Sequence, residues 1–460
     1  MAFSRHRLAR FRPSPSFVLL AAFLFVLWVA GGASRENVSG QIISRAAAWA
    51  SIILAVLFTG RPRIKEARGT ALLLLAAIIL CIVQLVPLPP DLWRALPGRD
   101  AFADPIISPP DLWRPLSLVP GATLNALFSL VVPLAVLLLA TGIHEDQKRW
   151  LPATILAVIA SSLVIGLIQI TGTRMANPLV NGTPGAIDGL IANRNHYALI
   201  LSFGLLITPV WAFGSSGRSK KRAPVALGFV VLLVLTILAT GSRTGLVLGG
   251  LALALGLFLS RRSLKTTFQR YPRWVLPTVS ISVIAMLAIF VLASIAADRA
   301  VSIDRLVDQD AGQDMRGRGL PIVLAMIRTY FPFGAGMGSF DPIFRMHEPF
   351  TLLKPTYFNH AHNDFLEIIL NAGLPGLLLL LVAIGWWGWK SFVAWRGDAA
   401  HLLPRLGSAM LLLVLIASVT DYPARTPIIM AIATIAAIWL EGSVPSANGK
   451  GSLPPTERHL

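Results

Sequence analysis

The chain has 460 residues, of which 55% are hydrophobic and only 13% are charged, and its net charge is +18. A soluble domain carries roughly 25% charged residues, so this composition excludes an ordinary soluble protein and indicates one that crosses a membrane many times. The single cysteine, Cys81, lies in an apolar run, so it forms no disulfide within the chain and is expected to be a small buried side chain.

The first 33 residues combine a basic start, with four arginines before residue 16, and an apolar run over 17–33. This pattern resembles a signal peptide. Because many further apolar runs follow and none of them needs a separate export signal, we predict that the run is retained as the first membrane span.

Apolar runs continue along most of the chain. A helix needs about 20 residues to cross a bilayer of roughly 30 Å, and backbone groups in lipid must be satisfied within the segment. We therefore predict an all-α polytopic membrane protein, a single integral membrane domain over 1–460 with about twelve spans. The expected spans are 17–33, 42–60, 69–88, 121–143, 151–171, 195–213, 223–240, 244–260, 275–297, 364–389, 406–420 and 427–441.

The charges indicate the orientation of these spans. With the N-terminus inside, 24 of the 40 Lys and Arg but only 6 of the 22 Asp and Glu fall on the inner side, so the whole net charge lies there. Excess Lys and Arg marks cytoplasmic loops, so both termini are predicted to be cytoplasmic. The charge then reports orientation and attraction to anionic membrane lipid, and we expect no nucleic-acid partner.

The longest outer segment covers residues 298–363, and loops of this length are usually functional. We predict that this large loop is partly helical, with a helix over 319–330. The glycine-rich stretch 334–340 follows, and it is expected to be flexible or to turn tightly.

Several polar motifs fall on the same outer side, and three of them open a span. Helix N-termini favour anions, and the arginine fork fits phosphate oxygens, so together these motifs predict an anion site at the outer membrane boundary. A lipid diphosphate would place its anion there and its chain in the bilayer. The residues predicted to bind the diphosphate are Arg194, His196, Arg243, Arg316 and Arg318.

The densest polar cluster, residues 359–367, contains two histidines, His360 and His362. A neutral histidine can take a proton from a sugar hydroxyl while arginines stabilise the departing diphosphate, so this cluster predicts inverting glycosyl transfer. Asn363 and Glu367 flank His362 and are expected to orient it. A metal site at these histidines lacks a further His or Cys cluster to complete it, so we expect neither metal nor cofactor.

The residues around this cluster resemble those of the O-antigen ligase/polymerase superfamily. His362-Asn363, nine residues, Gly373, two residues and Gly376 are similar to the His-Asn-x9-Gly-x-x-Gly signature of the ligases. The stretches 332–340, 193–198 and 242–245 are similar to other motifs of the family, so the resemblance covers about 190–380. Asn371 departs from the pattern, because relatives often have Glu there.

The resemblance implies a membrane fold related to C-type glycosyltransferases, in the bacterial inner membrane, with the active site facing the periplasm. It implies transfer of a glycan from undecaprenyl diphosphate. The acceptor is the lipid A–core in a ligase or a second undecaprenyl-linked glycan in a polymerase, and the motif does not separate the two. It also implies that His362, with His360 as its rival, is the base.

Two other classes remain open from the sequence. Twelve spans suit a transporter or flippase of envelope glycan precursors, but the charges gather at one face and no paired broken helices are visible. A non-catalytic scaffold for envelope assembly is the third possibility. Alanine at His362 distinguishes it, because a scaffold would keep its glycan output.

Overall fold

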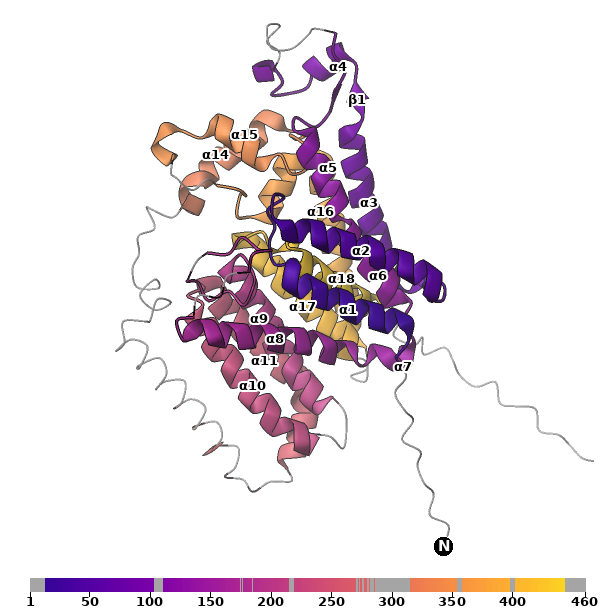
Figure 1. Ribbon diagram of the computed structural model, residues 1–460, viewed down its shortest axis with the longest axis vertical. Coiled ribbons are helices and arrows are strands. Elements are labelled where there is room, and N and C mark those ends of the chain that lie inside the picture. The colour runs from indigo at the N-terminus through magenta and orange to yellow at the C-terminus, as the bar shows by residue number, and fades with distance from the viewer. Residues whose placement is uncertain are drawn as a thin grey trace, which may run out of the picture.

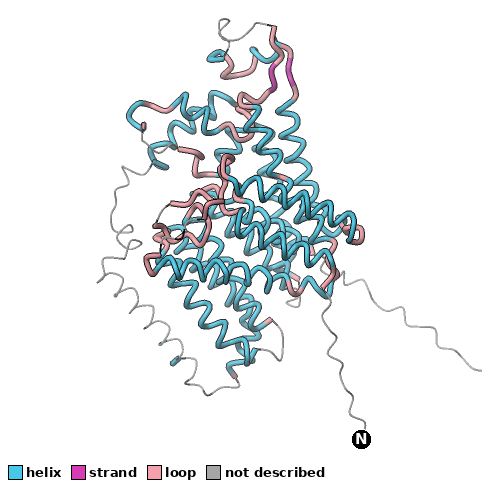
Figure 2. Tube along the Cα trace, viewed as in Figure 1, coloured by secondary structure: helices cyan, strands magenta, loops and turns pink. Residues whose placement is uncertain are grey.

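The computed structural model describes residues 13–102, 111–214, 219–269, 315–353, 358–397 and 402–442, apart from 174, 176 and 184, together with a few single positions between 272 and 285. These residues form a mainly helical protein with one two-stranded antiparallel pairing (Figures 1 and 2). The elements are α1 (Pro15–Ala30), α2 (Ser39–Phe58), η1 (Ile64–Ala67), α3 (Arg68–Leu85), β1 (Pro87–Leu88), α4 (Pro90–Arg94), η2 (Asp100–Phe102), β2 (Arg114–Pro115), α5 (Pro120–Ser129), α6 (Val131–Thr141), α7 (Glu145–Lys148), α8 (Leu151–Ile170), α9 (Arg194–Phe213), α10 (Ser219–Ala239), α11 (Arg243–Phe268), α14 (Met315–Tyr330), α15 (Phe340–His347), η3 (Phe350–Leu352), α16 (Asp364–Arg396), α17 (Leu402–Thr420), η4 (Pro423–Arg425) and α18 (Pro427–Glu441).

Within the described residues, nine helical stretches are long and apolar enough to cross a membrane. They coincide with nine of the twelve expected spans. The expected first and last spans are α1 and α18, which are apolar but shorter, and the expected span at 275–297 falls largely outside the described residues. The mainly helical architecture with many apolar helices is therefore confirmed.

Helix α9 is the central helix of the bundle. It is buried along nearly its whole length and packs against α8, α10, α11 and α17. A helix that is apolar on all sides is stable only when other helices surround it, which is how α9 sits. The large apolar core around it also includes residues of α1, α6 and α18.

Helices α14 and α15 lie together beyond one end of the bundle, at the upper left of Figure 1. They have a small apolar core of their own, in which Val323, Phe340, Phe344 and Phe358 pack with Leu370 of α16. The helix expected at 319–330 is confirmed as α14. In Figure 2 many of the loops gather between this pair and the bundle.

Helix α16 is broken at Gly373, whose φ of 57° and ψ of −140° are not helical. The glycine-rich stretch packs against the break, because Ala335 N donates to Leu370 O at 2.9 Å and Gly336 N donates to Asn371 O at 2.8 Å. Gly334 has a φ of +81°, and a Cβ there would lie 2.6 Å from Asn371 O. The stretch was expected to be flexible or to turn tightly, and the structure shows the tight turn. Its glycines permit the close approach of two backbones.

A side chain of α3 fixes this contact. Gln84 donates from Nε2 to Asn371 O at 2.9 Å and accepts from Met337 N at Oε1 at 2.8 Å, and it is buried. One carboxamide thus satisfies a carbonyl of the broken helix and an amide of the glycine-rich stretch. It holds the first piece of α16, residues 364–372, in place against α3.

Candidate active site

Three helices, α9, α11 and α16, begin at the same end of the bundle, which we call the site end. Each is capped by the side chain before its first residue: Asn193 accepts from the α9 backbone at 2.8 Å, Ser242 from α11 at 2.9 Å and Asn363 from α16 at 3.0 Å. Side-chain caps are what these residue types favour. Ser242 Oγ also donates to Asn195 Oδ1 at 2.7 Å and ties α11 to α9.

The turn between α17 and α18 brings a carboxylate, Asp421, to the site end. Its side chain is buried, and it accepts from Asn195 Nδ2 at 2.6 Å and from Asn193 Nδ2 at 3.2 Å. A charge as deeply buried as this one is stable only with several partners. Asp421 therefore links the start of α9 to the turn that precedes α18.

Cationic and imidazole groups complete the surroundings of Asp421. His362 Nδ1 lies 3.3 Å from Oδ1, His196 Nε2 lies 3.6 Å from Oδ1, and Arg316 Nη2 lies 3.4 Å from Oδ2. Burial acts to raise the pKa of Asp421, but the contacts with His196 and His362 outweigh it and hold that pKa well below its usual range. Asp421 is therefore an anion at neutral pH, beside His362.

A second carboxylate, Glu367, contacts the other histidine, His360. Glu367 Oε1 lies 3.0 Å from His360 Nδ1, and its Oε2 accepts from Ala361 N at 2.8 Å. Arg425 bridges from the same inter-helix turn as Asp421, with Nη2 at 3.2 Å from Glu367 and Nε at 3.3 Å from Asp364. Burial alone would lower the pKa of Arg425, but these carboxylates raise it above its ordinary value.

Tyr422 packs against all three imidazoles of the site. Its ring centroid lies 4.2 Å from that of His360, 4.9 Å from that of His362 and 5.1 Å from that of His196. Burial, and then the charge of Asp421, raise the pKa of Tyr422 to about 12. The phenol therefore stays neutral and supports the rings as a packing surface.

The local backbone also places His362. Its φ is +50°, which is uncommon for a residue with a side chain, and it lies in the turn just before the Asn363 cap of α16. Phe358 packs on its ring at 5.1 Å between centroids and connects it to the core of α14 and α15. The site is thus supported from both the bundle and the outer helices.

The prediction that Glu367 orients His362 is wrong. Both oxygens of Glu367 are engaged by His360, Ala361 and Arg425, and His362 contacts Asp421 instead. His360 Nδ1 is hydrogen-bonded to Glu367, whereas His362 Nδ1 lies 3.3 Å from Asp421 Oδ1 without a hydrogen bond. In both rings Nδ1 is the nitrogen nearest a carboxylate, which leaves Nε2 as the nitrogen that can accept a proton.

The predicted anion ligands divide into exposed and anchored groups. Arg194 and Arg243 are exposed at the first positions of α9 and α11. Arg316 reaches Asp421, and Arg318 donates to Thr351 O at 2.8 Å. His196 is only 2% exposed and contacts Thr426 Oγ1 at 2.9 Å, so it lies behind the other groups rather than at the surface.

Sequence reasoning missed Asp421, Tyr422 and Arg425. One signal was present: Asp421 and Arg425 are the sole charged residues between 406 and 440, at the junction of two apolar runs. Charges in such a position are costly unless they have partners. In the part of the chain that the structure describes, no three His, Cys, Asp or Glu side chains are arranged to hold a metal ion.

One family model matches the chain, over residues 228–381, and its description is O-antigen ligase. This range includes α11, α14 and α15, the glycine-rich stretch and the start of α16 with both histidines. No curated protein matches the chain.

Proposed function

We propose that this chain, whose residues 228–381 match the family model described as O-antigen ligase, is a metal-independent inverting glycosyltransferase acting on a glycan linked to undecaprenyl diphosphate. The acceptor is a hydroxyl of the lipid A–core, as in a ligase, or of a second lipid-linked glycan, as in a polymerase. The site end faces the periplasm of a bacterial inner membrane, and both chain termini are cytoplasmic.

The observation that carries this proposal is the pair of histidines that lie beside buried carboxylates near the starts of α9 and α11. Asp421 lies 3.3 Å from His362 Nδ1, and Glu367 lies 3.0 Å from His360 Nδ1. An anion on Nδ1 orients the ring and stabilises the positive charge that forms when Nε2 takes a proton. The exposed Arg194 and Arg243, at helix N-termini, suit the diphosphate.

The reaction needs one displacement. The acceptor oxygen attacks the anomeric carbon of the donor, its proton passes to Nε2 of His362, and the bond from that carbon to the diphosphate oxygen breaks. The diphosphate leaves with the bonding electrons and is stabilised by the arginines. One displacement inverts the anomeric centre. We assign His362 as the base, because His362-Asn363 matches the His-Asn signature that the resemblance to the ligases rests on, and His360 is the rival.

A transporter or flippase would instead place its charged contacts at mid-span, around a central pathway. The contacts of Asp421, Glu367 and Arg425 lie at the ends of α9, α16 and α17. This placement favours the transferase.

The test uses cells that lack this gene, complemented with wild type, His362→Ala or His347→Ala at equal membrane abundance. His347 is the matched control, because it lies in α15 and contacts Ile343 O at 3.0 Å, away from both carboxylates. Surface polysaccharide is then run on a gel. We expect His362→Ala alone to lose glycan transfer, and an unchanged pattern would refute the proposal.

The same gel separates the two acceptors. Loss of glycan on the lipid A–core, with long undecaprenyl-linked chains accumulating, identifies a ligase. Single capped units without a ladder identify a polymerase.

A further inference from the structure

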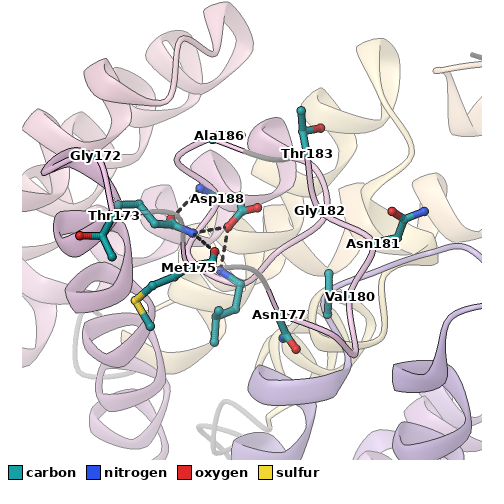
Figure 3. A pocket seen from close by; sticks show the side chains of 13 residues that line it. Gly172, Thr173, Met175, Asn177, Val180, Asn181, Gly182, Thr183, Ala186 and Asp188 are labelled. Carbon is teal, nitrogen blue, oxygen red and sulfur yellow. Dashed lines mark hydrogen bonds between the residues drawn. The ribbon is translucent and has the colours of Figure 1, made fainter.

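A cavity of about 210 Å³ lies in the connection between α8 and α9, apart from the histidine site (Figure 3). Amide, hydroxyl and carboxylate side chains line it together with apolar ones, and its described lining contains no Lys or Arg. The polar lining residues are Gln169, Thr173, Asn177, Asn181, Thr183 and Asp188.

Asp188 is the distinctive group of this cavity. It is only 8% exposed, and its Oδ1 accepts from Gln169 Nε2 at 2.8 Å and from Leu190 N at 3.1 Å. Gln169 Oε1 in turn accepts from the backbone N of Asp188 and of Gly189, at 3.0 and 2.9 Å. Figure 3 shows the bonds that join Asp188 to Gln169 and Leu190 as dashed lines. The carboxylate is therefore held in one orientation.

The second oxygen of Asp188, Oδ2, has no hydrogen bond among the described residues, and it borders the cavity on the side of Gly182. A Cβ added at Gly182 would lie 2.7 Å from Oδ2. A carboxylate oxygen that borders a cavity can accept a hydrogen bond from a hydroxyl group that enters it. The cavity is thus suited to a ligand that supplies a donor at this point.

The rest of the lining narrows the ligand class. Amides and hydroxyls both donate and accept, and Met175, Val180 and Leu190 add apolar surface. A sugar ring has this mixture, with hydroxyls at its rim and C–H groups on its faces. The cavity is smaller than the roughly 300–1,000 Å³ of pockets for drug-sized ligands. A calcium ion would need six or more oxygen ligands, but the described lining offers one carboxylate, and one of its two oxygens already accepts hydrogen bonds. The lining therefore does not fit calcium.

The cavity is also connected to the histidine site by a fixed segment. Asp188 precedes Asn193, the partner of Asp421, by five residues, which span at most about 18 Å. Ser162 Oγ donates to Gly189 O at 2.6 Å, and Ala192 N donates to Gly32 O at 2.9 Å. An oligosaccharide reacting at His362 therefore has a second sugar-sized site within reach.

We propose that this cavity binds one sugar residue of the glycan on which the protein acts, with sugar hydroxyls donating to Asp188 Oδ2. The inference rests on the proposed glycan transfer and adds a specificity site to it. The sugar comes from either the lipid-linked donor or the acceptor, and the chemistry is the same in both.

The experiment uses the full chain in lipid nanodiscs and saturation-transfer NMR with two soluble probes. One is the repeat-unit oligosaccharide released by mild acid from the lipid-linked donor, and the other is the released core oligosaccharide. Asp188→Asn replaces the acceptor oxygen, and Gly182→Ala places a methyl group against it. We expect both variants to weaken binding of one probe at least tenfold, while the control Ser161→Ala on α8 binds as wild type.

The outcomes separate the two proposals. Loss of the repeat-unit signal assigns the cavity to the donor, and loss of the core signal assigns it to the acceptor. We expect His362→Ala to keep binding and lose transfer. Wild-type transfer without binding of either probe, or unchanged binding in both variants, would overturn the cavity assignment. Probe binding without any transfer by wild type would instead overturn the proposed function and leave the cavity as a sugar site.

Discussion

Replacing Asp421 by Asn tests the assignment of the base. The two side chains have nearly the same shape, but one carboxylate oxygen becomes an NH2 donor. Asn193, Asn195, His362 and Arg316 all present N–H groups or a ring nitrogen to Asp421, at 2.6 to 3.4 Å. The new amide therefore faces groups that are themselves donors, and the anion beside His362 is lost.

The size of the effect follows from these contacts. A hydrogen bond to a charged group contributes about 1.5–3 kcal/mol. If the anion helps mainly when His362 is protonated in the transition state, its loss lowers kcat by about 10- to 150-fold. KM for the donor should change little, because Arg194 and Arg243 are untouched.

The assay is steady-state transfer by purified protein in nanodiscs, with kcat and KM measured separately for each variant. Asp341→Asn is the matched control, because Asp341 forms a half-exposed ion pair with Arg345 on α15 at 2.8 Å. Glu367→Gln serves as the comparison for His360. If Asp421→Asn keeps wild-type kcat while Glu367→Gln loses it, the base is His360 and the assignment of His362 is wrong.

Four further predictions follow from the site and its supports. Gly373→Ala should lower the unfolding temperature, because its Cβ would overlap the Pro332 carbonyl and because a side chain at φ +57° alone costs about 1–2 kcal/mol. The control Gly385→Ala should leave the unfolding temperature unchanged, because no atom lies within 4 Å of its added Cβ. Equal unfolding temperatures for the two variants would contradict the packing of the break. Arg243→Lys should raise the KM for the donor about tenfold, because an ammonium group lacks the fork geometry of a guanidinium. The control Arg261→Lys, on the same helix, should leave this KM unchanged. A wild-type KM for Arg243→Lys would show that Arg243 does not bind the diphosphate. Because the pKa of Asp421 is lowered in the folded protein, this group stabilises the fold above about pH 4, the pKa of an aspartate in the unfolded chain. That stabilisation is lost as the pH falls through the folded pKa. The unfolding temperature of Asp421→Asn should therefore depend less on pH below 4 than that of wild type. Transfer should persist in excess chelator, and strict dependence on added metal would contradict the histidine mechanism.

The sequence predicted the parts of this protein that depend on local pattern. Apolar runs of about 20 residues located the long helices, because a membrane fixes their length and polarity. Polar motifs were predicted to open three spans, but the capping roles of Asn193, Ser242 and Asn363 are seen only in the structure. The structure brings these three starts together at one end of the bundle.

The parts that failed depend on contacts across the chain. Asp421 lies 59 positions after His362, so no local pattern connects the two. Glu367 pairs with His360 across the turn that contains His362, and the backbone direction in such a turn is not visible from neighbouring residue types. The sequence located the glycine-rich stretch but did not show why glycines are needed there. They are needed because the backbone of Asn371, from another segment, packs against this stretch.

The break at Gly373 divides α16 into a long apolar helix and a short first piece that is held by other segments. The 23 residues from Leu374 to Arg396 form a helix of about 35 Å, which is enough to cross a bilayer alone. The preceding piece, with Asp364 and Glu367, is held by Gln84 and the glycine-rich stretch instead. A thinner or thicker membrane would change the tilt of the long piece at modest cost, while Asp364 and Glu367 keep their distances from Arg425. The break at Gly373 therefore separates the residues of the site end from the part of α16 whose tilt follows the thickness of the membrane.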